Sequence, residues 1–295
     1  MVCLSPTPIW TTRLTDTGIN LAFVRLAVQS GARALIADLR LTEEAEILIK
    51  QSPGKIAFTT CDVSNWRGLE NLPSEVQKAF GKNAVAQVWI AGAALFEPEW
   101  TSFLHDKEKD HYKALQVNTE HPIKLTRIAM RSCLGADKPG VVLIVASMAG
   151  ITGSYGAALY CASKHAVVGF TKSTAQADID ENIKVVCCCP GIVATPMWKG
   201  EAAKDIAAQY QYNDDVAIMP EDVAEAMKDM VEQAKYKGGT LLEVSKARLR
   251  GELESRQALV GDSPEMKAYM DHCYAPIREV FRKERGTSGS GSNGA

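Results

Sequence analysis

The sequence predicts an α/β fold with a doubly wound parallel sheet of about seven strands and helices on both faces. Two observations predict it. Short runs that are almost continuously apolar, and rich in Val, Ile and Cys, alternate with longer amphipathic stretches along most of the chain. Strands that are buried on both faces have this unbroken apolar character. Repeated alternation of such strands with helices favours right-handed crossovers, which make neighbouring strands parallel.

The elements follow in order along the chain. The apolar runs predicted to be strands are 8–12, 34–38, 55–62, 84–91, 141–146, 183–189 and 240–244. The amphipathic stretches predicted to be helices are 19–30, 66–80, 109–133, 159–178 and 221–233. The last of these follows Met219-Pro220, and proline is common in the first turn of a helix. Together they predict one Rossmann-like domain over residues 1–250.

Three segments lie outside this alternation. Residues 195–219 are mixed in composition and interrupted, as expected of a lid over an active site. Residues 251–285 are rich in charge and are predicted to form a helical C-terminal extension. Residues 286–295 consist mainly of glycine and serine, which predicts a disordered tail.

Composition excludes several classes of protein. The 295 residues are 46% hydrophobic and 23% charged, with a formal net charge of −2. Nucleic-acid-binding proteins usually carry a basic excess, so this balance argues against that partner. No apolar run reaches the roughly 18 residues that span a bilayer, and the first residues lack the pattern of a secretory signal. We therefore expect a cytoplasmic protein with neither a membrane nor a nucleic acid as partner.

The cysteines predict neither disulfides nor a metal site. Cys187, Cys188 and Cys189 are consecutive within a predicted strand. Successive side chains of a strand point to opposite faces, so these three cannot all meet one metal ion. No C-x-x-C pair occurs. We expect most cysteines to be small buried hydrophobic residues that stay reduced.

The residues that carry chemistry surround one predicted helix. Tyr160 and Lys164 are one helical turn apart near its start, so they lie on one face. Ser147 follows the preceding strand, and ligands of open α/β sheets bind at the carboxyl ends of strands. Tyr-x-x-x-Lys by itself is a common spacing with an ordinary helix-face pair as its alternative. The surrounding sequence favours a catalytic set.

Ser147, Tyr160-Cys161-Ala162-Ser163-Lys164 and the turn from Pro190 to Pro196 together resemble the short-chain dehydrogenase/reductase family. The resemblance covers residues from about 8 to 245, and in detail the sequence resembles fungal members that are often likened to 15-hydroxyprostaglandin dehydrogenase. It implies a Rossmann-like fold, oxidoreductase activity and a nicotinamide cofactor. It also assigns a fourth catalytic position to Asn118, which would hold a water that links Lys164 to solvent. A hydrogen bond between helices is the alternative for Asn118.

The chemistry of this set can be argued directly. A free tyrosine has a pKa near 10, too high for an efficient base at neutral pH. We expect the Lys164 ammonium, aided by a positive nicotinamide ring, to lower the pKa of Tyr160. Tyr160 would then exchange a proton with a substrate alcohol or carbonyl while a hydride moves to or from the ring. Ser147 would hold the same oxygen by a hydrogen bond.

The sequence departs from the family at two motifs that line the cofactor cleft. The family has Thr-Gly-x-x-x-Gly-x-Gly after the first strand, but here Leu14 and Asn20 replace two glycines and Gly18 remains. Asp16 adds a negative charge near the expected phosphates, although residues 15–17 also suit a helix cap. The family's Asn-Ala-Gly after the fourth strand is Gly92-Ala93-Ala94. We expect nucleotide binding to be weakened or lost, and glycines restored at 14 and 20 to tighten it.

Other positions on the cofactor side match the family. The expected cofactor-binding residues are Gly18, Ile19, Asp38, Asp62, Val63, Tyr160, Lys164, Val193 and Thr195. Asp38 ends the second strand, where an acidic side chain accepts hydrogen bonds from the adenine ribose and disfavours a 2′-phosphate. This favours NAD over NADP, although Arg40 lies two residues further on. A strand-end aspartate that faces water is the alternative for Asp38.

Three functions fit these observations. The first is an oxidoreductase that moves a hydride between a nicotinamide cofactor and a secondary alcohol or ketone. The second is a cofactor-independent isomerase or cyclase that uses the same Ser/Tyr/Lys set, and the third is a non-catalytic partner subunit. Met148, Tyr155, Met197 and Trp198 flank the site and favour a small hydrophobic substrate. The resemblance implies a homo-oligomer with contacts through helix 109–133 and suggests a role in secondary metabolism.

Overall fold

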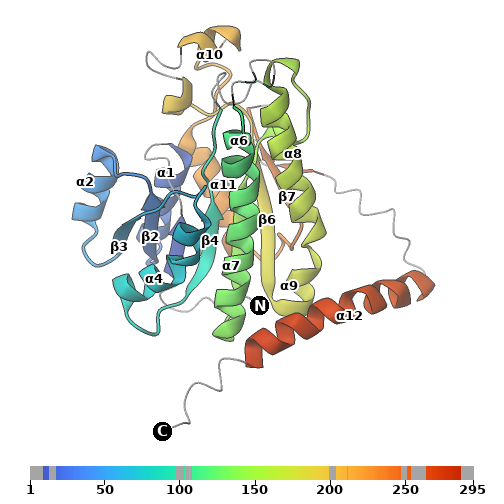
Figure 1. The fold of residues 1–295 in the computed structure, drawn as a ribbon. Helices are drawn as coiled ribbons and strands as arrows, with labels where there is room; N and C mark the ends of the chain where they lie inside the picture. Colours follow the sequence, from blue (N-terminus) through green and yellow to red (C-terminus); the bar gives the residue numbers. More distant parts are fainter. Residues whose placement is uncertain are drawn as a thin grey trace.

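The computed structural model describes residues 9–12, 18–96, 103, 106, 108–198, 204–210, 212–246, 251–253 and 264–286. Their strands form one sheet in the order β3-β2-β1-β4-β5-β6-β7-β8, with helices against both faces (Figure 1). The strands are β1 (Ile9–Thr12), β2 (Arg33–Asp38), β3 (Ile56–Thr60), β4 (Ala86–Ala91), β5 (Gly140–Val145), β6 (Ile183–Pro190), β7 (Leu241–Val244) and β8 (Gly251–Glu252). All pair in parallel except β7 with β8. The predicted doubly wound parallel sheet is confirmed.

The helices follow the predicted alternation with some divisions. They are α1 (Ile19–Gln29), α2 (Glu43–Gln51), α3 (Trp66–Glu70), α4 (Leu72–Phe80), α6 (Lys113–Leu115), a π-helical turn η1 (Gln116–Glu120), α7 (His121–Gly135), α8 (Ala158–Ser173), α9 (Gln176–Glu181), α10 (Lys204–Gln209), α11 (Pro220–Glu232) and α12 (Pro264–Gly286). Short 3₁₀ turns lie at Met148–Gly150, Tyr155–Ala157 and Pro196–Trp198. Helix α2 was not predicted. Its start is nevertheless marked by Thr42, which caps the helix by accepting a hydrogen bond from the backbone nitrogen of Ala45.

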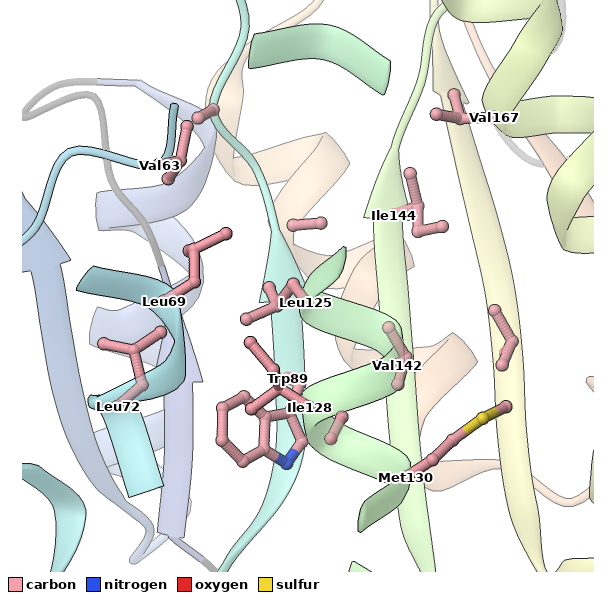
Figure 2. Packing of buried hydrophobic residues seen from close by; sticks show 14 of the residues in the cluster. Val63, Leu69, Leu72, Trp89, Leu125, Ile128, Met130, Val142, Ile144 and Val167 are labelled. Atoms are coloured by element: carbon pink, nitrogen blue, oxygen red, sulfur yellow. The ribbon is translucent and has the colours of Figure 1, made fainter. Parts of the chain in front are cut away.

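The hydrophobic core lies on both faces of the sheet, because helices cover each central strand on either side. On one face, Trp89 and Val142 pack with residues of α3, α4, α7 and α8 (Figure 2). On the other face, α1 and α11 cover the same strands. Cys187 and Cys189 belong to the first face and Cys188 to the second, which is the strand alternation that excludes a shared metal ion. Every cysteine that the structure describes is free, and only Cys273 among them is exposed.

The strand order places the candidate site. From β1 the chain moves outward through β2 and β3, then returns to the other side of β1 with β4. The order therefore reverses between β1 and β4, and ligands of open α/β sheets bind beside such a switch point, at the carboxyl ends of the strands. The segments that follow β1, β4, β5 and β6 all begin at this edge.

The C-terminal part adds a strand and a helix. Strand β8 pairs antiparallel with β7, and α12 runs across the ends of α7 and α9 (Figure 1). Ion pairs hold α12 there: Arg278 to Asp180 at 2.8 Å, Arg285 to Glu181 at 2.6 Å, and Arg127 to Glu284. Of the tail predicted at 286–295, Gly286 instead ends α12, and residues 287–295 lie outside the described residues. Within the described part, no helix combines the length and apolarity needed to cross a bilayer.

Candidate active site

Three of the predicted catalytic residues are placed by two neighbouring elements. Tyr160 and Lys164 lie one turn apart on α8, and the Lys164 ammonium is 5.7 Å from the centre of the Tyr160 ring. Ser147 follows β5 in extended backbone, where its Oγ donates to the Pro190 carbonyl at 3.5 Å and its hydroxyl lowers the pKa of Tyr160. Its Oγ also accepts a hydrogen bond from the backbone nitrogen of Ala149 at 3.1 Å, which fixes its rotamer. The phenol, the hydroxyl and the amine therefore share one end of the sheet.

Burial governs the protonation of Tyr160 and Lys164. Burial raises the pKa of Tyr160 to about 12, and the neighbouring Ser147 hydroxyl offsets this only in part. Burial also lowers the pKa of Lys164 to about 8, although the Cys187 and Cys189 thiols raise it slightly. As the pH rises, the lysine loses its proton before the tyrosine does. In the chain alone burial therefore gives a net upward shift of the Tyr160 pKa, and the lowering expected from Lys164 together with a positive nicotinamide ring stays a prediction.

The Lys164 side chain is held in place by the sheet. Its Nζ donates a hydrogen bond to the carbonyl of Val145, at the end of β5, at 2.9 Å. Only 2% of the residue is exposed. The amine thus lies between α8 and the strand ends, where its charge is poorly solvated and strongly felt by neighbouring groups.

Asn118 lies in the π-helical turn η1 and is fully buried. Its Oδ1 accepts a hydrogen bond from the backbone nitrogen of Leu95 at 2.7 Å, and its Nδ2 donates to the Leu95 carbonyl at 3.0 Å. The same Nδ2 donates to Ser163 Oγ on α8 at 3.1 Å. The carboxamide therefore joins the segment after β4 to the helix that carries Tyr160. This is the hydrogen bond between helices that the sequence left open, and the water-holding role stays a prediction.

Gly18 and Thr195, far apart in sequence, meet at the switch point. Gly18 has a φ of +85°, in the left-handed region that favours glycine, and a Cβ there would lie 2.7 Å from Thr195 Cγ2. Gly18 also caps α1, which Ile19 opens. The unpaired backbone N–H groups of a helix's first turn bind phosphate well. Glycine at position 18 is thus required both by its positive φ and by its close contact with Thr195, and the first turn of α1 begins beside this contact.

The remaining cofactor-side residues have identifiable partners in the protein. Asp38 is 7% exposed at the end of β2, and its Oδ1 accepts from the backbone nitrogen of Leu39 at 2.6 Å. Asp62 Oδ1 accepts from the Ser64 backbone nitrogen at 2.9 Å and from Ser64 Oγ at 2.7 Å. Val63 is buried in the core beside it. Asp62 and Val63 therefore shape the turn after β3, whatever contact they make with a cofactor.

The segment predicted to be a lid is closed at its base. Val193 forms a parallel bridge with Ile218, and the Ala194 nitrogen donates to the Ile218 carbonyl at 2.9 Å. The chain between them leaves the sheet and carries α10, which lies beyond the strand ends (Figure 1). Compact loops whose ends meet in this way are frequently functional.

Aromatic rings connect this lid to Tyr160. Phe96, just after β4, lies 4.5 Å from the Tyr160 ring, centre to centre. The Phe96 ring is also 5.8 Å from Trp198 and 5.5 Å from Tyr210. Trp198 stacks on Tyr212 at 5.2 Å with 6° between the ring planes. We call Phe96, Trp198, Tyr210 and Tyr212 the aromatic cluster. It gives the site an apolar wall on the lid side.

Comparison with known proteins decides the family. The family model described as short chain dehydrogenase matches residues 15–206. The chain belongs to the short-chain dehydrogenase family. It is 25% identical to mouse (Mus musculus) 15-hydroxyprostaglandin dehydrogenase [NAD(+)] over 243 residues, which is 76% of this chain and 85% of that protein. It is 29% identical to zebrafish (Danio rerio) carbonyl reductase family member 4 over 232 residues, or 76% and 91%. It is 28% identical to rice (Oryza sativa subsp. japonica) momilactone A synthase over 189 residues, or 64% and 68%.

This short-chain dehydrogenase is therefore an oxidoreductase of that family's type. Some of its site residues escaped sequence reasoning. Phe96, Tyr210 and Tyr212 were missed, although an aromatic residue in the segment that follows a predicted strand and a closely spaced tyrosine pair in the lid are visible signals. Conversely, Tyr155 is 84% and Met197 is 38% exposed. Of the four flanking residues named from the sequence, Trp198 is the one that joins the aromatic cluster.

Two further points concern what the described residues contain. Leu14 and Asp16, the most disruptive departures in the glycine motif, lie outside them. Within the described ranges no group of three or more His, Cys, Asp or Glu side chains is arranged to hold a metal ion.

Proposed function

We propose that this protein moves a hydride between a nicotinamide cofactor, NAD in preference to NADP, and a secondary alcohol or ketone of a small hydrophobic metabolite. Tyr160 is the acid/base in this proposal. The observation that carries it is the placement of Ser147, Tyr160 and Lys164 at the same sheet edge as the Gly18 turn. The names of the mouse and zebrafish relatives, an NAD(+)-dependent dehydrogenase and a carbonyl reductase, support it.

The residues present fit a dinucleotide. The Gly18 turn and the first turn of α1 would hold its phosphates beside Thr195, and Asp38 would face its adenine ribose. When bound, the nicotinamide ring supplies or accepts the hydride. Asp38 would place a negative charge against a 2′-phosphate, which is the reason for the preference for NAD.

This chain's own residues handle the proton. Because its pKa is raised to about 12, Tyr160 stays protonated at neutral pH and is ready to donate its proton to a carbonyl oxygen. Ser147, whose hydroxyl is near enough to lower the pKa of Tyr160, would hold the same oxygen. Alcohol oxidation requires the phenolate and so depends on positive charge close to the ring. These residues therefore favour ketone reduction near neutral pH.

Titration of the purified protein with NADH and NADPH, followed by calorimetry, tests the cofactor. We expect NADH to bind about tenfold or more tightly than NADPH, because the Asp38 carboxylate repels the 2′-phosphate. The variant Asp38→Asn should bring the two dissociation constants close together. Asp271→Asn, on the exposed part of α12, is the matched control and should change neither. Equal affinities in the wild type would contradict the assigned role of Asp38.

The isomerase or cyclase alternative depends on the departures in the glycine motif. Turnover of a substrate that persists without any nucleotide binding at millimolar NADH or NADPH would favour it over the redox function. Because Tyr160 is the acid/base in both functions, variants of Tyr160 do not distinguish the oxidoreductase from the isomerase or cyclase. A measurement of nucleotide binding distinguishes the two.

The aromatic cluster supports a ring-bearing substrate. We expect Trp198→Ala to raise KM for the reduction of tetralone about tenfold, because a stacked ring is lost from the site wall. KM for acetone, which has no ring to stack, should change little. An equal loss on both ketones would instead indicate that Trp198 only holds the lid together.

Homo-oligomerisation through helix 109–133, a role in secondary metabolism, the division of the chain at residues 250 and 285, and the cytoplasmic location stay predictions. Light scattering of the purified protein gives the oligomeric state directly.

A further inference from the structure

The side chain of Asn20 reaches from α1 to the end of β4. Asn20 lies in the first turn of α1 and is 4% exposed. Its Nδ2 donates a hydrogen bond to the carbonyl of Gly92 at 3.1 Å. Gly92 is the first residue after β4. The two positions at which this chain departs from the family, one in the glycine motif and one after the fourth strand, are therefore in direct contact.

Space at this contact allows only one side chain. A Cβ on Gly92 would lie 2.2 Å from Asn20 Oδ1, 2.4 Å from Nδ2 and 2.6 Å from Cγ, distances that atoms cannot adopt. Gly92 is not among the glycines with positive φ, so its backbone does not require glycine. Position 92 is glycine because the Asn20 carboxamide already fills the volume that its side chain would need.

The hydrogen bonds of this carboxamide are incomplete. The Gly92 carbonyl fixes the Nδ2 side, while Asn20 Oδ1 is buried and has no donor among the described residues. A buried acceptor without a donor destabilises the fold. The amide is therefore kept for the contact that it makes with the strand end and for the volume that it fills, rather than for a complete set of hydrogen bonds.

The contact lies at the switch point of the sheet. Asn20 is two residues beyond Gly18, which packs against Thr195, and Gly92 directly follows β4, the strand that the chain reaches after reversing direction. The carboxamide thus links the first turn of α1 to the end of β4, the two walls between which a dinucleotide is expected. The orientation of that turn determines where its N–H groups point.

We propose that the asparagine at position 20 and the glycine at position 92 are coupled, because the amide and the glycine have exchanged places relative to the family's motifs. We also propose that Asn20 is a positioning residue for the dinucleotide. The family places glycine at the first position and asparagine at the second, and this chain has the reverse. The two departures are therefore a single change that keeps an amide between helix and strand. The positioning role rests on the proposed function, whereas the coupled exchange does not.

A double-mutant cycle tests this proposal. The variants are Asn20→Gly, Gly92→Asn and the double variant, each measured for Tm and for NADH affinity by calorimetry. We expect Asn20→Gly to lower Tm and weaken NADH binding about tenfold, because the turn loses its support. Glycine restored at position 20 alone should therefore weaken NADH affinity rather than tighten it.

Gly92→Asn should lower Tm and NADH affinity at least as much, because two side chains compete for one volume. The double variant should return to within about threefold of the wild-type affinity.

Controls separate positioning from stability. Leu134→Ala, at the far end of α7 and 2% exposed, should lower Tm without changing NADH affinity. If Gly92→Asn does not fold, Gly92→Ala replaces it, since its Cβ already meets Asn20. Additive losses of Tm in the double variant would overturn the exchange. Recovery of Tm with NADH affinity unchanged throughout would overturn the positioning role. If the wild-type protein binds neither NADH nor NADPH, both the proposed function and the positioning role of Asn20 are contradicted. The Tm values of the single and double variants would still test the coupled exchange.

Discussion

Replacement of Tyr160 with phenylalanine is expected to lower kcat for the reduction of tetralone by NADH about 10²–10⁴-fold, the range that a positioned general acid contributes. The phenol is the group with a proton to donate at neutral pH, because burial raises its pKa to about 12. The measurement is the loss of NADH absorbance at saturating ketone. The ring itself remains, so its contact with Phe96 and the shape of the site are kept.

Two measurements make this prediction specific. Tyr160→Phe should bind NADH with nearly the wild-type affinity, since the substitution removes one hydroxyl. Tyr274→Phe, on α12, is the matched control and should retain full activity. Full turnover by Tyr160→Phe would contradict both the oxidoreductase and the isomerase functions, because each assigns the proton transfer to this hydroxyl.

The second large effect is expected from Lys164→Met in the reverse reaction. Oxidation of the alcohol formed from tetralone needs the Tyr160 phenolate, which a protonated Lys164 stabilises. In the chain alone Lys164 holds its proton only below a pKa of about 8, while Tyr160 holds its own to about 12. Methionine removes the positive charge at every pH. We expect kcat/KM with NAD to fall about tenfold near neutrality and its acid limb to move about one unit toward higher pH.

A second buried lysine provides the control. Lys184 on β6 is 5% exposed, and its Nζ donates to the carbonyls of Met230 and Val231 near the end of α11 at 2.7 and 3.1 Å. Burial lowers the pKa of Lys184 as well. Lys184→Met should lower Tm, since two carbonyls lose their donor, but should leave the pH profile unchanged. A profile that moves equally in both variants would show that charge beside Tyr160 is not the cause.

The architecture was predictable because its signals are local. Strands such as 141–146 are apolar throughout, and helices such as 159–178 alternate with them, so burial on both faces was visible from composition alone. The pair Tyr160 and Lys164 was predictable for the same reason, since helical spacing fixes which residues share a face. Helix α2 was missed because its sequence is dominated by charge, although its cap at Thr42 marks its start.

The protonation and the shape of the site were decided by packing. The sequence places an amine near a phenol, but only the fold shows how deeply both are buried, and in the chain alone burial raises the pKa of Tyr160 and lowers that of Lys164. The aromatic cluster likewise joins residues from three separate segments. Contacts of this kind depend on how the segments return to one edge of the sheet, which no local pattern encodes.

Asn20 and Gly92 show the same division most clearly. The sequence by itself determined the sheet, its order of elements and the residue types that handle the proton, because periodicity and spacing act within single elements. It presented the two cofactor-side departures as separate losses, since they stand seventy-two residues apart. The tertiary structure alone decided that they touch, because β4 returns beside β1 and two side chains cannot occupy one volume.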